Sequence, residues 1–390
     1  MEMSLEEVFE FIRNGASIKQ FNGSGVPITR IETIATGNID LDKVGYADIF
    51  DSKYESYYLK DGDILMSHIN SLKHLGKVAI VESLEDNVIH GMNLLCLRPK
   101  KMVCPKFLLN YFRTQQFNAE ILRISKKSVN QASFNITDLK KIKINLPNLE
   151  IQNKIADTLD LSSDLIEKRK EQIAEMDKLI QSVYCQINKN ETFDTMKVSD
   201  VVEKISTGKS YYSEEISTFK VLKTSAVSYG YFDDSQYKNL PREYDPPEST
   251  FVKKGDVLVS RMNTEELVGA SAYVWKDSDF LTLPDRLWKL HVMENVDPIY
   301  LWKTLQQSYF RDSIRRNASG TSGSMKNISQ KQFMSLKINI PNILIQKKFA
   351  SIVEEIEAQK KLMEESLHEM ENNFSALMKK AFRGELFPEE

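Results

Sequence analysis

The sequence KINLPNLEIQNKIA at residues 143–156 occurs a second time, as KINIPNILIQKKFA at residues 337–350. Nine of the fourteen positions are identical, and the two copies are offset by 194 residues. Self-similarity at a long fixed period indicates a repeated architecture. The chain is therefore predicted to contain two copies of one unit, each a globular part followed by a long helix. Such an arrangement suits a target made of two parts.

The repeat extends well upstream of this stretch. The sequence KDGDILMSHIN at residues 60–70 matches KKGDVLVSRMN at 253–263, here with an offset of 193. Gly15, Gly37 and Gly76 have glycine counterparts at the same offset. The extra residue of the second copy falls in the loop before Asn135 and its counterpart.

The composition is that of an ordinary globular protein. A chain of 390 residues is long enough for two or three cores, and 41% hydrophobic residues argue against disorder. No apolar run reaches membrane-spanning length, and the acidic start MEMSLEE is unlike a signal peptide. Cys96, Cys104 and Cys185 show no metal-ligand spacing. These features predict a cytoplasmic protein without disulfides or a zinc site.

Positive charge is concentrated in two segments, although the net charge of the chain is −3. Residues 98–143 contain eleven Lys or Arg and two acidic residues, and residues 302–337 contain seven and one. The two segments occupy equivalent places in the two copies. A solvated surface would explain either segment alone, but the matched positions favour a bound polyanion such as double-stranded DNA.

Each globular part, at 1–147 and 191–340, has the pattern of an α+β domain. Short β-rich runs alternate with turn residues, at 64–66, 78–81 and 94–97 in the first copy and at 257–259, 271–274 and 287–292 in the second. Apolar residues at helical spacing predict one helix over 105–124 and one over 298–316. A domain with a curved sheet is expected.

Long helices are predicted at 148–190, as a central spacer, and at 341–390, as a C-terminal spacer. Pro147 and Pro341 suit the approach to a first turn, and Asn148 and Asn342 suit the N-cap. About 40 residues at ~1.5 Å each give a rod of ~60 Å. The apolar stripes of both rods agree in phase, and the chain must return along the first rod, so the pair is predicted to be an antiparallel coiled coil. Its predicted core is Ile166, Ile173, Met176, Ile180, Val183, Met363, Leu367, Met370, Phe374 and Leu377.

Two paired helices cannot bury all of their apolar side chains. Several of these lie off the main seam and are predicted to contact helices of a partner protein, with packing against the chain's own domains as the alternative. They are Leu161, Leu165, Leu179, Tyr184, Leu362 and Phe382.

Three short motifs resemble parts of enzyme sites, and each lacks something that its chemistry requires. DPPE at 245–248 has a glutamate where an amino-group methyltransferase motif needs an aromatic residue for base stacking, so a proline turn is predicted. TGKS at 207–210 lacks the first glycine of a phosphate-binding loop, because position 203 is glutamate. Pro284-Asp285 is not followed by the second carboxylate of a metal-dependent nuclease. The sequence therefore predicts no catalytic residues and no metal site, and favours a recognition protein.

The combination of these features resembles the DNA-specificity subunit of type I restriction–modification systems. Each of the two similar target-recognition domains ends in a strand and a Leu/Ile-Pro-x-x-x-x-Gln helix start, at 147–152 and 341–346. A Gly-Asp-Ile/Val-Leu-x-Ser strand lies within each domain, and AFRGEL at 381–386 ends the second helix. The likeness covers essentially the whole chain.

The resemblance implies a reader of DNA that performs no chemistry itself. It would recruit two methylation subunits through its helices, together with motor-nuclease subunits in the full complex. S-adenosylmethionine, ATP and Mg would be bound by those partners and not by this chain. Two dissimilar domains would read a bipartite, asymmetric target, and the rods would set the separation of its half-sites.

Candidate base readers lie where the two copies diverge, because a residue identical in both cannot explain two different half-sites. Asn70 and Asn263 resemble adenine readers, but their identity favours a role in turns. Phosphate contacts are favoured for Arg123, Arg315 and Arg316, and each single residue has a solvated loop charge as its alternative. The predicted DNA-binding residues are His68, Lys73, His74, Lys77, Arg123, Lys126, Lys127, Asn130, Gln131, Lys209, Arg261, Arg315, Arg316, Ser319, Thr321, Ser324 and Lys326.

Two other kinds of protein remain open at this point. A DNA methyltransferase or nuclease with its own active site, fused to recognition domains, would need a cofactor pocket, and S-adenosylmethionine binding by the isolated chain would support it. A coiled-coil scaffold without a DNA role would have no need of the two basic segments.

Overall fold

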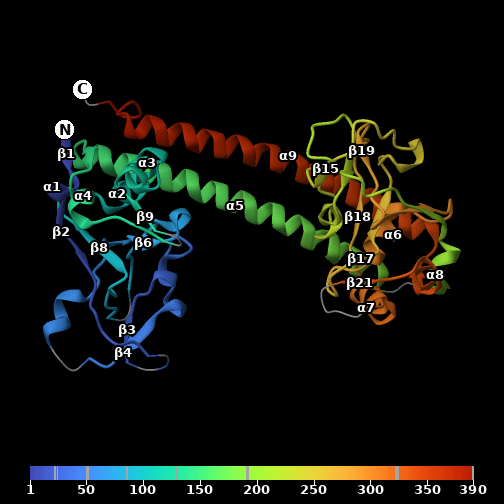
Figure 1. Cartoon of the computed structure of the whole chain (residues 1–390), viewed down its shortest axis with the longest axis horizontal. Helices are drawn as coiled ribbons and strands as arrows, with labels where there is room; N and C mark the ends of the chain where they lie inside the picture. The colour runs from blue at the N-terminus through green and yellow to red at the C-terminus, as the bar shows by residue number, and fades with distance from the viewer. Residues whose placement is uncertain are drawn as a thin grey trace. The chain divides into compact units, whose positions relative to one another are not determined.

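In the computed structural model, the two copies form two compact units that divide the long helices between them (Figure 1). Unit 1 comprises Met1–Glu171 and Glu364–Glu390, and unit 2 comprises Gln172–Met363. The structure describes residues 1–21, 23, 25–49, 52–84, 87–128, 131–189, 193–320 and 325–388.

Unit 1 is built on a four-stranded antiparallel sheet of order β2-β8-β5-β7. Its Val, Leu and Ile residues pack against short helices in a core that includes Phe107, Phe112 and Phe117. The elements of the sheet and its helices are β2 (Phe9–Asn14), β5 (Ile64–Ser67), β7 (Val78–Ile80), β8 (Leu94–Pro99), α1 (Leu5–Val8), α2 (Pro105–Phe112), α3 (Gln115–Ile124) and α4 (Ile136–Lys140). Smaller pairings join β1 (Glu2–Ser4) to β11 (Lys143–Asn145) and β3 (Val26–Ile28) to β4 (Gly45–Ala47).

Unit 2 repeats this topology, with a sheet of order β13-β20-β16-β18. The predicted duplication and the α+β class are therefore confirmed element by element. The corresponding elements are β13 (Val202–Ser206), β16 (Val257–Ser260), β18 (Ser271–Tyr273), β20 (Leu287–Val292), α6 (Pro298–Leu305), α7 (Ser308–Asn317) and α8 (Gln330–Ser335). Here β12 (Asp194–Lys197) pairs with β22 (Lys337–Ile340), and β14 (Lys220–Leu222) pairs with β15 (Tyr237–Asn239) and β19 (Leu281–Thr282).

Each helix predicted over 105–124 and 298–316 is in fact two helices, so the prediction of single helices is wrong. In unit 1, the first helix ends at Phe112, and Thr114 starts the second by accepting a hydrogen bond from the Phe117 N–H at 3.1 Å. A threonine hydroxyl competes for backbone donors in this way and favours a new N-terminus. The break lets Phe112 and Phe117 meet with ring centroids 4.6 Å apart.

The two long helices, α5 (Leu149–Asn188) and α9 (Ile343–Phe382), have 40 residues each. The predicted N-caps are confirmed: Asn148 accepts from the Ile151 N–H at 3.0 Å, and Asn342 accepts from the Leu344 N–H at 3.0 Å. None of the helices within the described ranges is long and apolar enough to cross a membrane.

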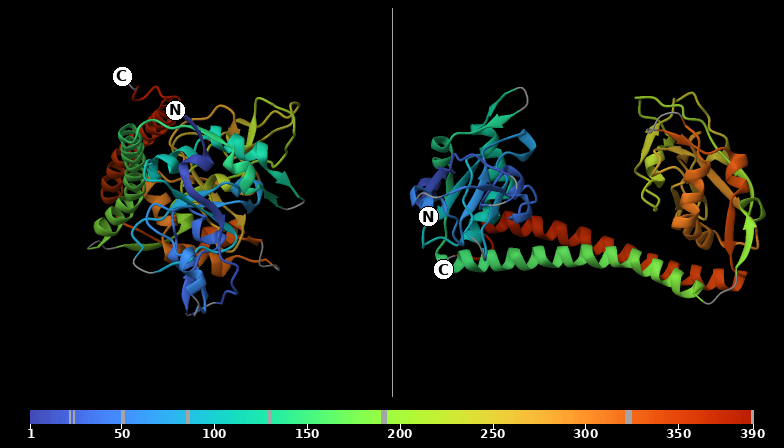
Figure 2. Two further views of the ribbon diagram at one scale, coloured as in Figure 1. Left: turned by 90° about the vertical axis from the view of Figure 1, so that its left-hand side faces the viewer. Right: turned by 90° about the horizontal axis from the view of Figure 1, so that it is seen from below.

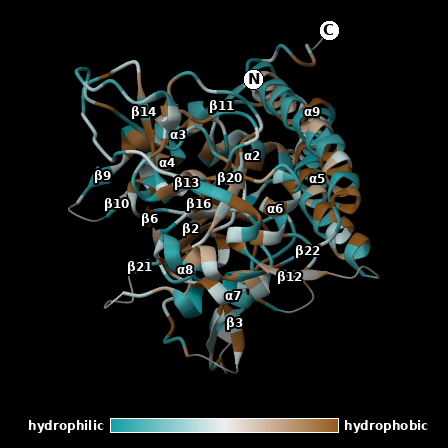
Figure 3. Ribbon diagram, turned by 90° about the vertical axis from the view of Figure 1, so that its right-hand side faces the viewer, coloured by the Kyte–Doolittle hydropathy of each residue, from teal (hydrophilic) through white to brown (hydrophobic). Residues whose placement is uncertain are grey.

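The two long helices run antiparallel, as each unit shows separately (Figure 2). In unit 1, the start of α5 shares a core with the end of α9, and Lys170 pairs with Glu371 at 3.1 Å. In unit 2, the end of α5 shares a core with the start of α9, and Lys360 pairs with Asp177 at 2.6 Å. Both helices carry apolar and polar faces along their length (Figure 3).

The predicted seam of the helix pair is at least partly buried throughout. Ile166 and Ile180 are buried. The remaining predicted residues are half-buried, namely Ile173, Met176, Val183, Met363, Leu367, Met370, Phe374 and Leu377.

The glutamine of each repeated helix start has a structural role that the motif alone did not reveal. Gln152 accepts the Cys104 N–H at 2.8 Å and donates to the carbonyls of Pro147 at 2.8 Å and Met102 at 3.2 Å. Gln346 accepts the Asp297 N–H at 2.9 Å and donates to the Pro341 carbonyl at 2.8 Å. Both side chains are 1% exposed. Each glutamine therefore joins the start of a long helix to the residue before α2 or α6.

Candidate nucleic-acid interface

The helices α3 and α7 hold basic side chains at equivalent places. Each helix buries two apolar residues, Phe117 and Ile121 in α3 and Phe310 and Ile314 in α7, and this burial fixes its orientation. The last turns then present exposed Arg123, Arg315 and Arg316. Arg123 pairs with Glu120 at 2.5 Å and Arg315 with Asp312 at 2.9 Å, both within one helical turn. Such exposed pairs are weak, so both arginines are free to exchange a carboxylate for a phosphate.

A short hairpin follows each of these helices. In unit 1, β9 (Lys126–Lys127) pairs with β10 (Ala132–Ser133), which also pairs with β6 (Ile69–Asn70). Lys126, Lys127 and Gln131 are exposed on it. In unit 2, β17 (Met262–Asn263) pairs with β21 (Lys326–Asn327). Asn130, Thr321 and Ser324, which were predicted to contact DNA, lie outside the described residues.

Two backbone hydrogen bonds and one ion pair stabilise the unit 2 hairpin. Ser319 and Asn327 exchange two backbone hydrogen bonds at 2.9 Å. The Lys326 Nζ lies 4.0 Å from a carboxylate oxygen of Glu265. Ser319 is exposed and Lys326 is half-buried, so the hairpin keeps polar side chains at the surface.

Asn70 and Asn263 form turns. Each side-chain amide donates to the serine three residues earlier, at 3.3 Å and 3.4 Å. Each side-chain oxygen accepts the next residue's N–H, at 2.8 Å and 2.9 Å. Their identity in the two copies therefore reflects a shared turn.

His68 is the predicted DNA contact that the structure contradicts most clearly. It is 7% exposed, its ring meets Phe134 edge-on at 6.4 Å between centroids, and burial lowers the pKa of its imidazole. A buried, neutral ring under an aromatic side chain does not reach a base edge. Its counterpart Arg261 is half-buried, and the Arg261 carbonyl accepts the Ile328 N–H at 3.0 Å beside the hairpin.

The remaining predicted DNA-binding residues lie on loops. Lys73 is exposed and His74 half-buried in a short 3-10 turn, Leu72–His74. Lys77 is half-buried and donates to the Ala35 carbonyl at 2.7 Å, so its charge is already partly engaged. Lys209 is exposed in the loop after β13.

Four of the six side chains predicted to contact a partner are exposed on the long helices. Leu161 and Leu165 lie on α5 in unit 1, and Leu179 and Leu362 lie on α5 and α9 in unit 2. The prediction is wrong for Tyr184, which is 8% exposed between Tyr300 and Phe349. Phe382 is half-buried and packs on Phe107, with ring centroids 5.2 Å apart. Both aromatic rings lie off the seam because they fasten the long helices to their own units.

The three motifs that resembled parts of enzyme sites lie in loops and turns of unit 2. In DPPE, the Pro247 carbonyl accepts the Thr250 N–H at 2.9 Å, which is the predicted proline turn. Within the described ranges, no group of three or more His, Cys, Asp or Glu residues is placed to hold a metal ion.

Comparison with known proteins agrees with this geometry. The model of the type I restriction modification DNA specificity domain matches residues 1–175 and 190–372. A Methanocaldococcus jannaschii protein named as the specificity subunit of the MjaX type I restriction enzyme is 37% identical over 255 residues, which are 65% of this chain and 56% of that protein. The EcoKI specificity subunit of Escherichia coli is 25% identical over 189 residues, which are 47% of this chain and 41% of that protein. The chain thus spans about half the length of these relatives.

Two solved structures share the fold along the whole chain. The S subunit of a type I restriction–modification system from M. genitalium has a TM-score of 0.58 at 15% identity, and the alignment covers 98% of this chain and 96% of that one. A chain from a structural study of assembly and conformational transition in a type I system has a TM-score of 0.59 at 17% identity, covering 99% and 98%. At these identities the likeness concerns the fold.

Proposed function

We propose a function from one established premise: this chain belongs to the family of type I restriction–modification DNA specificity proteins. The chain binds double-stranded DNA at a bipartite, asymmetric sequence, and each unit reads one half-site. It performs no chemistry itself. The methylation subunits that bind it supply S-adenosylmethionine and methyl transfer, and motor-nuclease subunits supply ATP- and Mg-dependent cleavage.

The observation that carries this proposal is one fold used twice with different surface residues. The sheets have the same strand order in both units, and basic helix ends occupy equivalent places. Equivalent folds can make equivalent phosphate contacts on a duplex. The surface loops differ, with Lys126 and Lys127 in one copy where Ser319 and Gly320 stand in the other. Different side chains at equivalent places read different bases, which supports an asymmetric target.

Methylome sequencing tests this function. The full chain is expressed with the methylation subunit of its own host in a bacterium that lacks type I methylation. We expect one methylated motif with two unlike halves separated by unread bases. A palindromic motif, or methylation by the chain without its partner, would refute the proposal.

Replacing Arg315 and Arg316 together by glutamine is expected to weaken binding to every duplex sequence. Each lost phosphate contact lowers the slope of log affinity against log salt by about 0.9, so the double variant should lose up to about 1.8. At low salt this corresponds to a loss of roughly 10-fold or more. Binding titrations of cognate and scrambled duplexes at several salt concentrations measure it.

The matched control for this variant is the double substitution of Lys347 and Lys348 by glutamine. Both lysines are exposed on α9 in unit 2, and the change in net charge is the same. We expect the salt slope of this control to stay at the wild-type value. Equal slopes in the two double variants would show that α7 contacts no phosphate.

Exposed leucines on α5 are expected to bind a methylation subunit. Leu161 and Leu165 are 62% and 48% exposed and lie one turn apart on the helix. Replacing both by glutamate should weaken association by roughly 10²- to 10⁴-fold, because each buried leucine contributes about 1.5–3 kcal/mol and about 1.4 kcal/mol corresponds to tenfold. Co-purification and titration with the methylation subunit measure this loss. Leu41→Glu, an exposed site of unit 1 away from the long helices, should leave association unchanged.

A further inference from the structure

Each unit contains a surface pocket, and the two pockets are built from equivalent positions of the repeat. The unit 2 pocket has a volume of about 500 Å³ and the unit 1 pocket about 390 Å³. Eight residues that line the unit 1 pocket correspond, at the constant offset of 193, to eight that line the unit 2 pocket. Because the two pockets lie at equivalent positions, the pocket is a feature of the repeated fold and is not specific to one unit.

The backbone beside each pocket makes a similarly close crossing in both units. Gly15 and Gly208 pass so close to the segment opposite that a Cβ atom would lie 2.3 Å from the His90 carbonyl oxygen or 1.8 Å from the Leu283 carbonyl oxygen. Hydrogen bonds fasten the crossing, from the Ala16 N–H to the His90 carbonyl at 2.9 Å and from the Gly208 N–H to the Pro284 carbonyl at 3.2 Å. The crossing fixes the position of the turn at residues 91–93 in unit 1 and 284–286 in unit 2, here called the pocket turn. The side chains of this turn therefore project from a rigid backbone.

The side chains on this turn differ between the units. At its end stand Asn93 in unit 1 and Arg286 in unit 2, and just before them stand Met92 and Asp285. Asn93 and Arg286 are exposed, and within the described part of the chain no hydrogen bond or ion pair engages either side chain. Both are therefore free to meet a ligand, on turns that the backbone crossing holds in place.

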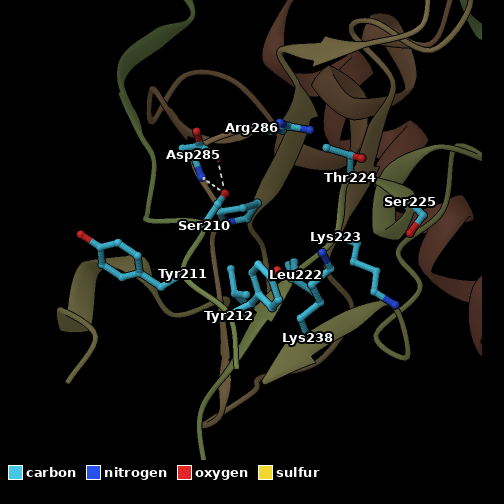
Figure 4. Close-up of a pocket in the computed structure, with 12 residues that line it drawn as sticks. Ser210, Tyr211, Tyr212, Leu222, Lys223, Thr224, Ser225, Lys238, Asp285 and Arg286 are labelled. Atoms are coloured by element: carbon cyan, nitrogen blue, oxygen red, sulfur yellow. Dashed lines mark hydrogen bonds between the residues drawn. The ribbon is translucent and has the colours of Figure 1, made fainter. Parts of the chain in front are cut away.

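The other residues that line the two pockets also differ in charge between the units. In the unit 2 pocket, Tyr212, Lys223 and Lys238 lie together, and the Lys238 Nζ lies 4.7 Å above the Tyr212 ring (Figure 4). Asp285, the residue before Arg286, accepts a hydrogen bond from the Ser210 hydroxyl, and this bond fixes the position of its carboxylate. In the unit 1 pocket, Arg30 donates to Gln20 at 2.7 Å, and Glu32 is exposed nearby. The unit 2 pocket is thus the more positively charged of the two.

Backbone hydrogen bonds link the unit 2 pocket turn to the hairpin that ends in β21. The Arg286 carbonyl accepts the Arg261 N–H at 3.0 Å, and the Arg261 carbonyl accepts the Ile328 N–H at 3.0 Å, next to β21. In unit 1, the His68 carbonyl accepts the Phe134 N–H at 3.2 Å, and β5 pairs Ser67 with Leu94, the residue after Asn93. Backbone hydrogen bonds and strand pairing therefore connect the hairpin region to the pocket turn in each unit.

We propose that each of these two pocket turns reads a base pair of its unit's half-site, an inference that rests on the proposed function. Arg286 pairs bidentately with guanine O6 and N7, and Asp285 accepts from N4 of the paired cytosine. Asn93 pairs with adenine N6 and N7, and Met92 contacts the methyl group of the paired thymine. These are the pairings that the donor and acceptor pattern of the major groove permits. Unit 2 thereby reads a G·C pair, and unit 1 reads an A·T pair.

The test is methylome sequencing of the full chain, expressed with its methylation subunit, as wild type, Asn93→Ala and Arg286→Ala. Each variant is the control of the other. We expect Arg286→Ala to lose the requirement for one G·C pair in one half-site, with discrimination at that position falling on the order of 10- to 100-fold. Asn93→Ala should relax one A·T pair in the other half-site. The untouched half-site should keep its wild-type bases in each case.

Arg286→Lys separates base reading from attraction to phosphate. Lysine keeps the charge but lacks the bidentate geometry of the guanidinium. We expect it to relax the same G·C pair as alanine does, while the salt dependence of binding stays at the wild-type value. A variant motif identical to that of the wild type would overturn the inference, as would equal weakening at all sequences. If the wild type itself yields no bipartite motif, the proposed function fails first and the inference falls with it.

Discussion

Gln346→Leu is expected to lower the free energy of unfolding of unit 2 by roughly 2–4 kcal/mol. The substitution removes the acceptor of the Asp297 N–H and the donor to the Pro341 carbonyl, at a site that is 1% exposed. Leucine fills a similar volume but leaves both backbone groups buried and unpaired, and each such group costs about 1–3 kcal/mol. The loss also loosens Asp297, whose carboxylate caps α6 through the N–H groups of Ile299 and Tyr300.

Urea unfolding followed by tryptophan fluorescence measures this effect in unit 2 specifically. All three tryptophans of the chain, Trp275, Trp288 and Trp302, belong to unit 2. The control is Gln359→Leu, the same substitution at an exposed position of α9, which should leave the midpoint within experimental error. Equal midpoints for both variants would show that the buried amide contributes nothing to stability.

These glutamines illustrate what the sequence could and could not reveal. Their recurrence at 152 and 346 identified the duplication and the start of each long helix, and the Asn148 and Asn342 caps followed from local chemistry. The role of each amide depends on a loop about 50 residues away in sequence, near Cys104 or Asp297. Local patterns do not encode which distant backbone groups need a partner. The motif was therefore visible, while its physical cause was not.

At the candidate nucleic-acid interface, too, the sequence predicted some features and missed others. Charge counting found the basic ends of α3 and α7, because adjacent residues carry that signal. Periodicity gave one helix where two exist, because apolar spacing continues across Arg113–Thr114 and across Gln306–Gln307. It also placed Tyr184 and Phe382 among the free side chains, because a helical wheel does not show the domain packed against the helix. The pocket turns carried a signal that was available, namely the difference between Met92-Asn93 and Asp285-Arg286 at equivalent positions of the repeat.

Lengthening the two long helices together is expected to change the spacer of the target and leave its half-sites intact. The insertion adds four helix-forming residues after Gln172 in α5 and four after Met363 in α9, where both helices pass from one unit to the other. Four residues add ~6 Å of helix, which corresponds to one or two base pairs at ~3.4 Å each. Methylation of the original motif should fall on the order of 10³-fold, because one of the two half-sites would then be bound only non-specifically.

Matched insertion is needed because the helices form one antiparallel pair. A change in α5 alone would displace Asp177 from Lys360 or Lys170 from Glu371, and would thereby confound spacing with damage to the seam. Methylome sequencing should return both wild-type half-sites with a longer gap. Glu171→Ala with Glu364→Ala alters the same exposed region without changing its length and should leave the motif unchanged. If the lengthened chain kept the original gap, the helices would not set the spacing, whereas altered half-site bases would mean that base reading depends on them.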